Sequence, residues 1–250
     1  MDSKGQFGLT YTEDFSVACV INHLKQEEVL QYFINRVSFY AFNGGEMEAV
    51  ALWATHVVVD CRYAYQTEVL PAEDKKIQRL SIRYISLLSE LDANPALTTV
   101  EKMKESFYLM KEWEDKMLPH ADYPKTYELD RENFLILTFD FNLLCRMNGL
   151  STQQVLQYFI EKVSLPIQRA KNLFGIIEKD AGMSLFGMML MSRSMQKTKL
   201  PAQQYIYNFY SERLIDLDNR LKKEMSIDKR VSVYRAFYAE WYRTLKKSMR

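Results

Sequence analysis

The chain has 250 residues, 48% hydrophobic and 26% charged, which is the composition of a folded globular protein and excludes an intrinsically disordered one. Eight Gly and six Pro are few for this length, so the composition favours long helices over short strands and turns. No basic stretch leads into an apolar run at the N-terminus, and no stretch approaches the roughly 20 apolar residues of a membrane span. Three cysteines without CxxC spacing predict reduced thiols in the cytoplasm.

The net charge of +1 hides an asymmetry along the chain. Residues 1–126 carry 13 Lys and Arg against 19 Asp and Glu, whereas residues 127–250 carry 20 against 13. The basic excess lies in residues 220–250, which carry 10 basic and 3 acidic side chains. Such a tail can meet a polyanion, be the solvated face of a helix, or dock on the acidic first half. We favour the last two, because the tail also carries many aromatic residues at helical spacing.

The clearest pattern is an internal repeat. Residues 12–38 and 138–164 align without a gap at an offset of 126, with 14 of the 27 positions identical. The tripeptide Leu70-Pro71-Ala72 reappears as Leu200-Pro201-Ala202, so the repeat continues. We therefore predict an all-α fold, possibly with a short two-stranded ribbon, made by tandem duplication of a helical unit of about 125 residues with pseudo-twofold symmetry. The predicted units are 1–126 and 127–250, which can pack as one globular body.

The first predicted elements are two short helices joined by a tight turn. Thr12 is a good N-cap, and Asp14 lies in the first turn, where the helix dipole favours an anion. The first helix ends near Asn22, and His23 stands where the second copy has Gly. Because His is among the residues tolerated at positive φ, we expect the turn to survive at some cost. The second helix has an apolar face made of Val29, Tyr32, Phe33, Ile34 and Val37.

Longer helices are predicted in the rest of the first half. Residues 46–69 are apolar on most faces and read as a central helix. Helices are then predicted at about 73–91 and 98–117, separated by the break at Asp92-Ala93-Asn94-Pro95. Residues 118–124, with two prolines, are predicted to link the two halves.

The second half opens on the apolar stretch 134–137, which is either a strand or a backward extension of the next helix, and whose side chains we expect to be buried. The second hairpin follows, with Thr138 as N-cap, Gly149 in the turn and the S-x-x-Q capping box of Ser151 and Gln154. The region 167–196 is rich in Met, which we expect to fill an irregular core rather than to line a partner groove. The last predicted helices span about 202–223 and 227–247.

Each hairpin resembles a DNA-binding helix-turn-helix motif. In that motif a small residue lies four before the turn Gly and a β-branched residue six after it, as Cys145, Gly149 and Val155 do here. The first copy matches apart from His23. With a strand in front, the unit also resembles half of a ribbon-helix-helix, and two copies would form an internal pseudo-dimer. These resemblances and the basic tail imply possible nucleic-acid contacts by Gln153, Gln154, Gln157, Lys162, Lys222, Lys223, Lys229 and Arg230.

Other features argue against DNA readout by the hairpins. The first copy carries Glu27 and Glu28 where the second has glutamines. The candidate ribbon 134–137 has no polar side chain to place in a groove. We therefore do not favour DNA binding through these modules.

No catalytic, cofactor or metal site is predicted. His56 and Asp60 share a helical face, but a metal needs three or four convergent ligands, so a hydrogen bond between them is the preferred interpretation. The sequence has no HExxH, no Gly-rich phosphate loop and no G-x-S-x-G. Cys19 and Cys145 recur at the same hairpin position, where packing of a small residue at a helix crossing explains them.

These patterns predict a non-enzymatic helical binding protein, a protein-interaction or adaptor module with an unknown protein partner and no membrane partner. The alternative is a nucleic-acid-binding accessory or regulatory factor, which would use hairpins 12–38 and 138–164 and the basic C-terminal helix. An enzyme whose site has no sequence signature is the third hypothesis.

Overall fold

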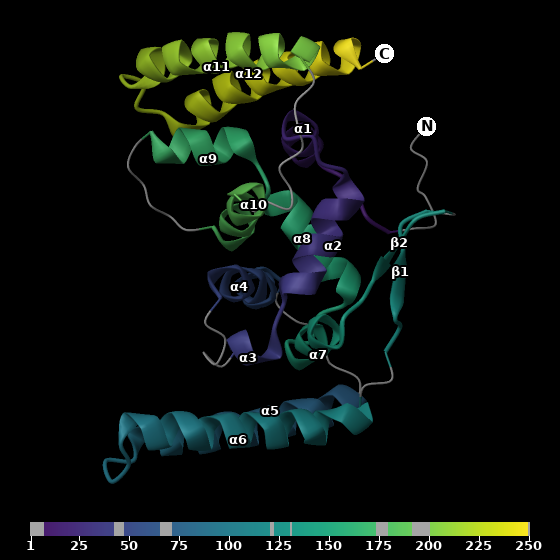
Figure 1. The fold of residues 1–250 in the computed structure, drawn as a ribbon, viewed down its shortest axis with the longest axis vertical. Helices are drawn as coiled ribbons and strands as arrows, with labels where there is room; N and C mark the ends of the chain where they lie inside the picture. Colours follow the sequence, from purple (N-terminus) through teal and green to yellow (C-terminus); the bar gives the residue numbers. More distant parts are fainter. Residues whose placement is uncertain are drawn as a thin grey trace. The chain divides into compact units, whose positions relative to one another are not determined.

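The computed structural model describes residues 8–42, 48–65, 72–120, 123–130, 132–173, 180–191 and 201–249. Over this part of the chain, twelve α-helices, one short 3-10 turn and one two-stranded sheet make up the regular structure. The expected all-α class with a short ribbon is therefore confirmed. The chain divides into two compact units, each assembled from separate stretches of sequence and described here by itself (Figure 1).

Unit 1 consists, among the described residues, of Gly8 and the residues from Gln31 to Leu156. It contains the end of α2 from Gln31 onward and the start of α8 as far as Leu156. Its elements are α2 (Gln26–Arg36, in part), α3 (Phe39–Phe42), α4 (Ala49–Ala64), α5 (Ala72–Ala93), α6 (Thr99–Met117), η1 (Leu118–His120), β1 (Thr126–Glu128), β2 (Phe134–Ile136), α7 (Phe139–Met147) and α8 (Thr152–Lys162, in part).

Unit 2 consists of the residues from Leu9 to Leu30 and those from Gln157 onward. It contains the first turn of α2 and the last turns of α8. Its other elements are α1 (Glu13–Ile21), α9 (Leu165–Asn172), α10 (Ala181–Met191), α11 (Pro201–Leu221) and α12 (Ile227–Ser248).

The boundaries between the units fall inside two helices. One lies between Leu30 and Gln31 in α2, and the other between Leu156 and Gln157 in α8. The compact units are thus not the stretches 1–126 and 127–250 that the repeat predicts. The repeat concerns sequence and the units concern space, so the predicted duplication and its pseudo-twofold symmetry stay predictions.

The turns of the two hairpins have the predicted local geometry. The Thr12 and Thr138 side chains accept hydrogen bonds from the backbone N–H groups of Phe15 and Phe141, which caps α1 and α7. His23 has φ 55° and Gly149 has φ 71°, so His23 adopts the left-handed conformation that Gly adopts in the second hairpin. The predicted capping box at the start of α8 is confirmed, since Ser151 Oγ accepts from Gln154 N at 3.2 Å and Gln154 Oε1 accepts from Ser151 N at 2.8 Å.

The core of unit 1 is organised around Trp113 of α6. Tyr84 of α5 stacks on its indole ring, with centroids 5.7 Å apart and planes inclined by 5°. Phe39 of α3 meets the same indole edge-on at 4.9 Å. Tyr84 is itself fixed, because its hydroxyl donates to Glu112 at 2.8 Å. One buried indole therefore joins three helices of unit 1.

The β1–β2 ribbon of unit 1 corrects one expectation. Residues 134–136 form a strand paired antiparallel with β1, with Tyr127 opposite Leu135, so the choice between strand and helix is settled as strand. Leu135 is buried, but Phe134 and Ile136 are 58% and 59% exposed, so the expectation that this stretch is buried was wrong for these two. Successive side chains of a strand point to opposite faces, and only one face of this ribbon is covered.

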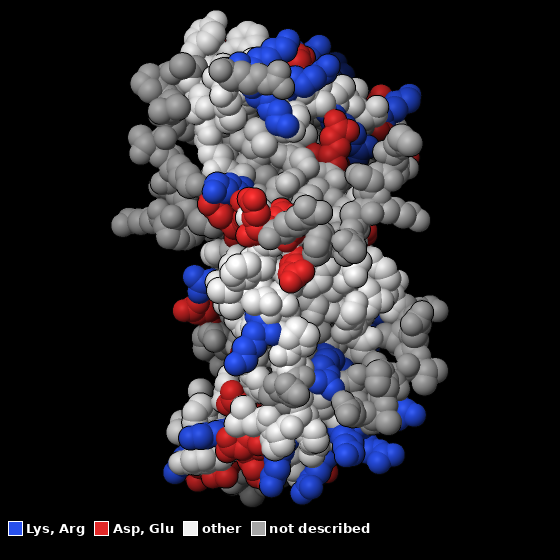
Figure 2. All heavy atoms as spheres, turned by 90° about the vertical axis from the view of Figure 1, so that its right-hand side faces the viewer, with Lys and Arg blue, Asp and Glu red and all other residues white. Residues whose placement is uncertain are grey.

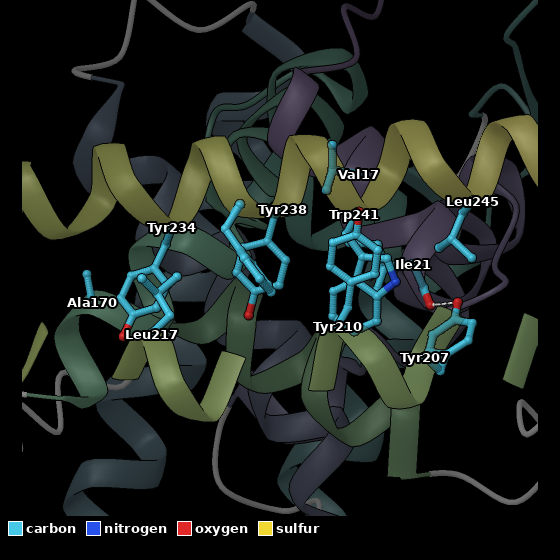
Figure 3. Packing of buried hydrophobic residues seen from close by; sticks show 11 residues of the cluster. Val17, Ile21, Ala170, Tyr207, Tyr210, Leu217, Tyr234, Tyr238, Trp241 and Leu245 are labelled. Atoms are coloured by element: carbon cyan, nitrogen blue, oxygen red, sulfur yellow. Dashed lines mark hydrogen bonds between the residues drawn. The ribbon is translucent and has the colours of Figure 1, made fainter. Parts of the chain in front are cut away.

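The core of unit 2 lies where α12 packs against α1, α9 and α11. Figure 3 shows Tyr234, Tyr238, Trp241 and Leu245 of α12 pointing toward α11. Trp241 stacks on Tyr210 at 5.4 Å with planes inclined by 6°. The Tyr207 hydroxyl donates to the backbone carbonyl of Ile21, which ties α11 to the end of α1 (Figure 3). The aromatic residues that the sequence places on its last two helices thus form the core of this unit.

The long helices begin and end close to their predicted limits. For α5, α6, α11 and α12 every boundary lies within two residues of the prediction. The predicted helix 46–69 is described only in part, as α4, and the Met-rich stretch 167–196 contains most of α9 and all of α10. Met183 and Met189 are buried, as expected of core residues, whereas Met191 is 79% exposed and Met195 lies outside the described residues.

Candidate interaction surfaces

The three glutamines of the second hairpin use their side-chain amides on backbone groups. Gln153 Nε2 donates to the Gly8 carbonyl at 2.6 Å, and Gln154 serves the capping box. Gln157 bridges the backbone of Thr10 through both amide atoms, at 2.9 and 3.0 Å. Reading a base edge would require these bonds to break, so the hairpin glutamines are structural in this conformation.

The predicted basic contacts divide into exposed and buried side chains. Lys222, Lys223 and Lys229 are exposed, whereas Lys162 is partly buried, with Nζ 5.0 Å from the centre of the Tyr158 ring. Arg230 is only 1% exposed, and its Nη2 donates to the Lys222 carbonyl at 3.2 Å. Arg230 therefore holds the start of α12 against the end of α11, and the surfaces defined below leave it out.

Unit 2 carries six exposed Lys and Arg side chains, three around the α11–α12 turn and three in the last two turns of α12, which together we call the basic face. None of the six forms an ion pair within the described part of the chain. Figure 2 shows basic side chains gathered over the C-terminal end of α12, with few acidic ones among them. Over its sequence unit 2 carries 19 Lys and Arg against 13 Asp and Glu, whereas unit 1 carries 14 against 19. The members of the basic face are Lys222, Lys223, Lys229, Arg243, Lys246 and Lys247.

A second surface is a row of apolar side chains on α6, which we call the α6 stripe. Val100, Met103 and Phe107 are 76%, 68% and 57% exposed, and their i, i+3, i+7 spacing places them along one side of the helix. Phe107 is held on one side by the Tyr40 ring, with centroids 6.4 Å apart and planes inclined by 24°. Tyr40 is fixed in turn, because its hydroxyl donates to Glu114 at 2.6 Å.

The α6 stripe was missed in the sequence, although its spacing was readable. The buried apolar residues of α6, Met110, Trp113 and Met117, follow the stripe along the chain at the same i, i+3, i+7 spacing. The apolar pattern therefore runs over about five turns of the helix, and only its C-terminal part is buried in the unit's own core.

The buried thiols offer no nucleophile to a ligand. Cys19, Cys61 and Cys145 are buried and form no disulfide. Burial raises the pKa of the Cys19 thiol to about 12, and the charge of Glu27 adds to the effect. Burial also raises the pKa of Cys145. Because the thiolate is the reactive form, these cysteines act as core side chains.

Ser164 is a buried serine hydroxyl bonded to a carboxylate, and its role is also structural. Its Oγ donates to Asp14 Oδ2 at 2.7 Å and accepts from Ile167 N at 3.3 Å, which caps α9. Asp14 also pairs with Arg235, at 3.0 and 2.9 Å. No histidine is among these bonded partners, so the arrangement lacks the general base that activates a serine.

Within the described residues, no three His, Cys, Asp or Glu side chains gather as metal ligands would. No helix in the described part of the chain combines the length and the apolar character that crossing a bilayer requires. Comparisons with protein-family models, with curated proteins and with solved structures returned no match.

Proposed function

We propose that this chain is a non-enzymatic protein-interaction module, built by tandem duplication of a helical unit. The duplication is supported by the helix bounds: α1 and α7 each have nine residues and begin 126 residues apart, and α2 and α8 each have eleven and begin 126 apart. It is also supported by the matching caps and left-handed turn residues. A cytoplasmic location is part of the proposal and is supported by the three thiols, which form no disulfide.

The α6 stripe carries the proposal of a protein partner. Three adjacent large apolar side chains that stay in water are unusual unless something covers them. Burying such a side chain contributes about 1.5–3 kcal/mol, so covering all three can hold a partner of moderate affinity. A straight row along two helical turns fits another helix laid alongside it.

The charges beside the α6 stripe specify the chemistry of that helix. Lys104 lies four residues after Val100, and Lys111 four after Phe107, so both border the stripe on one side, and both are exposed. We propose that the occupant is an amphipathic helix of another protein, with acidic residues along one border of its apolar face. The lysines would select the orientation of that helix, while the apolar contact would supply the affinity.

The test is capture of a partner that depends on the α6 stripe. The full chain, its Met103→Asp variant and its Ser86→Asp variant would be used as baits in native lysate, with captured proteins quantified by mass spectrometry. Ser86 is exposed on the neighbouring helix α5, so Ser86→Asp is matched in charge while sparing the stripe. We expect a stoichiometric partner that Met103→Asp loses and Ser86→Asp retains. Equal capture by both variants, or no stoichiometric partner at all, would overturn the proposal.

A second candidate function rests on the basic face of unit 2. Six exposed cations without ion-pair partners suit the phosphates of a nucleic acid, contacted through the backbone without base readout. This version of the nucleic-acid hypothesis no longer uses the hairpin glutamines or Arg230, because their side chains are engaged or buried.

Fluorescence anisotropy with duplex and single-stranded oligonucleotides across a salt series would test this second function. Binding should weaken linearly in log salt, and Lys229→Gln/Lys246→Gln/Lys247→Gln should lower affinity and reduce the slope by about 3. A matched triple change of Lys75, Lys76 and Lys102 to Gln in unit 1 should leave binding intact. No binding even at low salt would eliminate this function.

A further inference from the structure

Each compact unit combines the first part of a hairpin from one half of the sequence with helices of the other half. Unit 2 joins Leu9–Leu30 to the residues from 157 onward, and unit 1 joins residues 135–156 to the residues from 31 onward. Both cuts fall at equivalent positions of the repeat, because residue 156 lies 126 after residue 30. We infer that the two halves exchange the first part of their hairpins (residues 9–30 and 135–156), so that α1 docks on helices of the second half and α7 on helices of the first half.

The docking of the first hairpin is recorded by contacts inside unit 2. Gln157 of α8 holds the Thr10 backbone through two hydrogen bonds. Thr12 Oγ1 donates to the Ile160 carbonyl at 3.5 Å. The Phe15 ring meets Phe159 edge-on, with centroids 6.4 Å apart. These partners all lie in α8, the second helix of the second hairpin, and α1 also packs against α9 and α12 of the second half.

The second hairpin makes the same set of contacts inside unit 1, with the two halves interchanged. Gln31 holds the Ile136 backbone, with Oε1 accepting at 2.8 Å and Nε2 donating at 2.9 Å. Thr138 Oγ1 donates to the Ile34 carbonyl at 3.4 Å, and the Phe141 ring meets Phe33 edge-on at 5.6 Å. The corresponding atoms in unit 2 belong to Gln157, Thr10, Thr12, Ile160, Phe15 and Phe159, each 126 residues away.

Asp14 and Asp140 occupy equivalent positions in the two hairpins, but their surroundings differ. Asp14 of the first hairpin pairs with Arg235 of α12. Asp140 of the second hairpin has the Phe39 N–H as its donor at 2.9 Å, and Glu114 lies near enough to disfavour its charge. If the first hairpin took the place of the second in unit 1, Asp14 would lie near Glu114 and would lose Arg235.

The helices that follow the hairpin in each half, such as α9 and α12, therefore accept the hairpin of another copy of the repeat. This statement rests on the duplication proposed above, whereas the exchange itself rests on the contacts within each unit. It implies that a chain with a single repeat would complete its fold only by pairing with a second copy, as a hairpin-exchanged homodimer. The duplicated chain supplies both copies itself.

Cysteine cross-linking in the full chain tests the exchange. Two pairs report the exchanged arrangement, Thr10→Cys/Gln157→Cys and Gln31→Cys/Ile136→Cys. The matched pairs Thr10→Cys/Gln31→Cys and Gln157→Cys/Ile136→Cys use the same four positions and report the unexchanged one. Each double variant would be treated with a short bismaleimide at low protein concentration, and cross-linked peptides of the monomer would be quantified by mass spectrometry. The unsubstituted chain controls for the native thiols.

We expect the exchanged pairs to cross-link about ten-fold more than the matched pairs, because a contact within one compact unit gives a high effective concentration. The reverse preference, or equal yields from both sets, would overturn the exchange. If one exchanged pair closes and the other does not, the equivalence of the two hairpins fails, and with it the proposed homodimer of a single repeat.

None of these outcomes depends on the α6 stripe, so a failure here is distinct from a failure to find a partner protein. Should these bridge variants unfold, Asp14→Cys/Ser164→Cys against Asp14→Cys/Ser38→Cys gives the same comparison.

Discussion

The Gln157 side chain and the Thr10 backbone form a closed two-bond bridge. Gln157 Oε1 accepts from Thr10 N at 2.9 Å, and Nε2 donates to Thr10 O at 3.0 Å. An amide side chain here takes the place of a neighbouring strand, since it satisfies both backbone groups of one extended residue. Gln31 forms the same bridge to the Ile136 backbone in unit 1. The same interaction therefore occurs twice, and each copy can be removed by itself.

Replacing either bridging glutamine with Leu should destabilise the protein by a similar amount. Gln157→Leu and Gln31→Leu each remove the two bridge hydrogen bonds and one to a side chain four residues on, at partly exposed positions. We expect a loss of about 1–2 kcal/mol from the free energy of unfolding. Urea denaturation followed by circular dichroism measures it. Gln204→Leu, at an exposed position of α11, is the control and should change stability by less than about 0.5 kcal/mol. A loss confined to one of the two bridges would contradict their equivalence.

The left-handed turn at Gly149 predicts an asymmetry between small substitutions. At φ 71° a Cβ costs about 1–2 kcal/mol, so Gly149→Ala should lower the free energy of unfolding by that amount. Gly149→Asn should cost less, because Asn tolerates this conformation. Thermal and urea unfolding of the two variants provide the comparison. Equal stability of Gly149→Ala and the unsubstituted protein would show that the turn carries no strain.

Asp140 should make stability depend on pH in the direction opposite to a paired carboxylate. Burial raises its pKa, the hydrogen bond from Phe39 N partly offsets this, and Glu114 raises it further. The folded state then holds the proton more tightly than the unfolded state, so stability falls as pH rises from the unfolded pKa near 4 to the raised folded pKa.

Asp140→Asn removes the titrating carboxyl group while keeping an acceptor for the Phe39 N–H. The variant should therefore gain stability relative to the unsubstituted protein as pH rises from about 4 to 7. Urea unfolding at several pH values gives the difference at each point. A difference that stays constant or shrinks over this range would rule out the buried carboxyl as its source.

The three cysteines should react very slowly with thiol reagents in the folded protein. All are buried, and burial raises the pKa of Cys19 to about 12, so little thiolate is present at pH 8. A chromogenic disulfide reagent should titrate three thiols after denaturation and fewer than one within minutes in the native state. Rapid native labelling of one cysteine would show that its hairpin or helix opens readily.

Much of the fold was readable from local chemistry. Thr12, Thr138 and the Ser151–Gln154 capping box mark helix starts because side chains there bind backbone groups a few residues away, and these bonds are present as predicted. His23 was also identified correctly, since its alignment with Gly149 fixes the backbone conformation that the turn requires. The limits of the four long helices follow from apolar periodicity in the same way.

What the sequence could not reveal is which body each hairpin joins. An apolar face such as Val155, Phe159 and Ile160 says that something covers it without saying whether the cover lies before or after it in the chain. The same limit applies to the candidate sites. The hairpin glutamines have the side chains of base readers, yet their amides bind Gly8, Thr10 and the α8 cap, and Arg230 is buried beneath the Lys222 carbonyl. The α6 stripe differs from the buried apolar residues that follow it on the same helix only in that no described part of unit 1 covers it.

The order in which the chain is synthesised gives the exchanged hairpin a kinetic consequence. The hairpin that begins with α1 leaves the ribosome early, but the helices it packs with in unit 2, α9 and α12, are among the later segments made. Its apolar residues Val17 and Ile21 have no permanent cover until Trp241 and Leu245 have emerged. Unit 1, in contrast, can close once Leu156 is released. During translation unit 1 can therefore fold before unit 2, and the hairpin that is synthesised first is the last to pack.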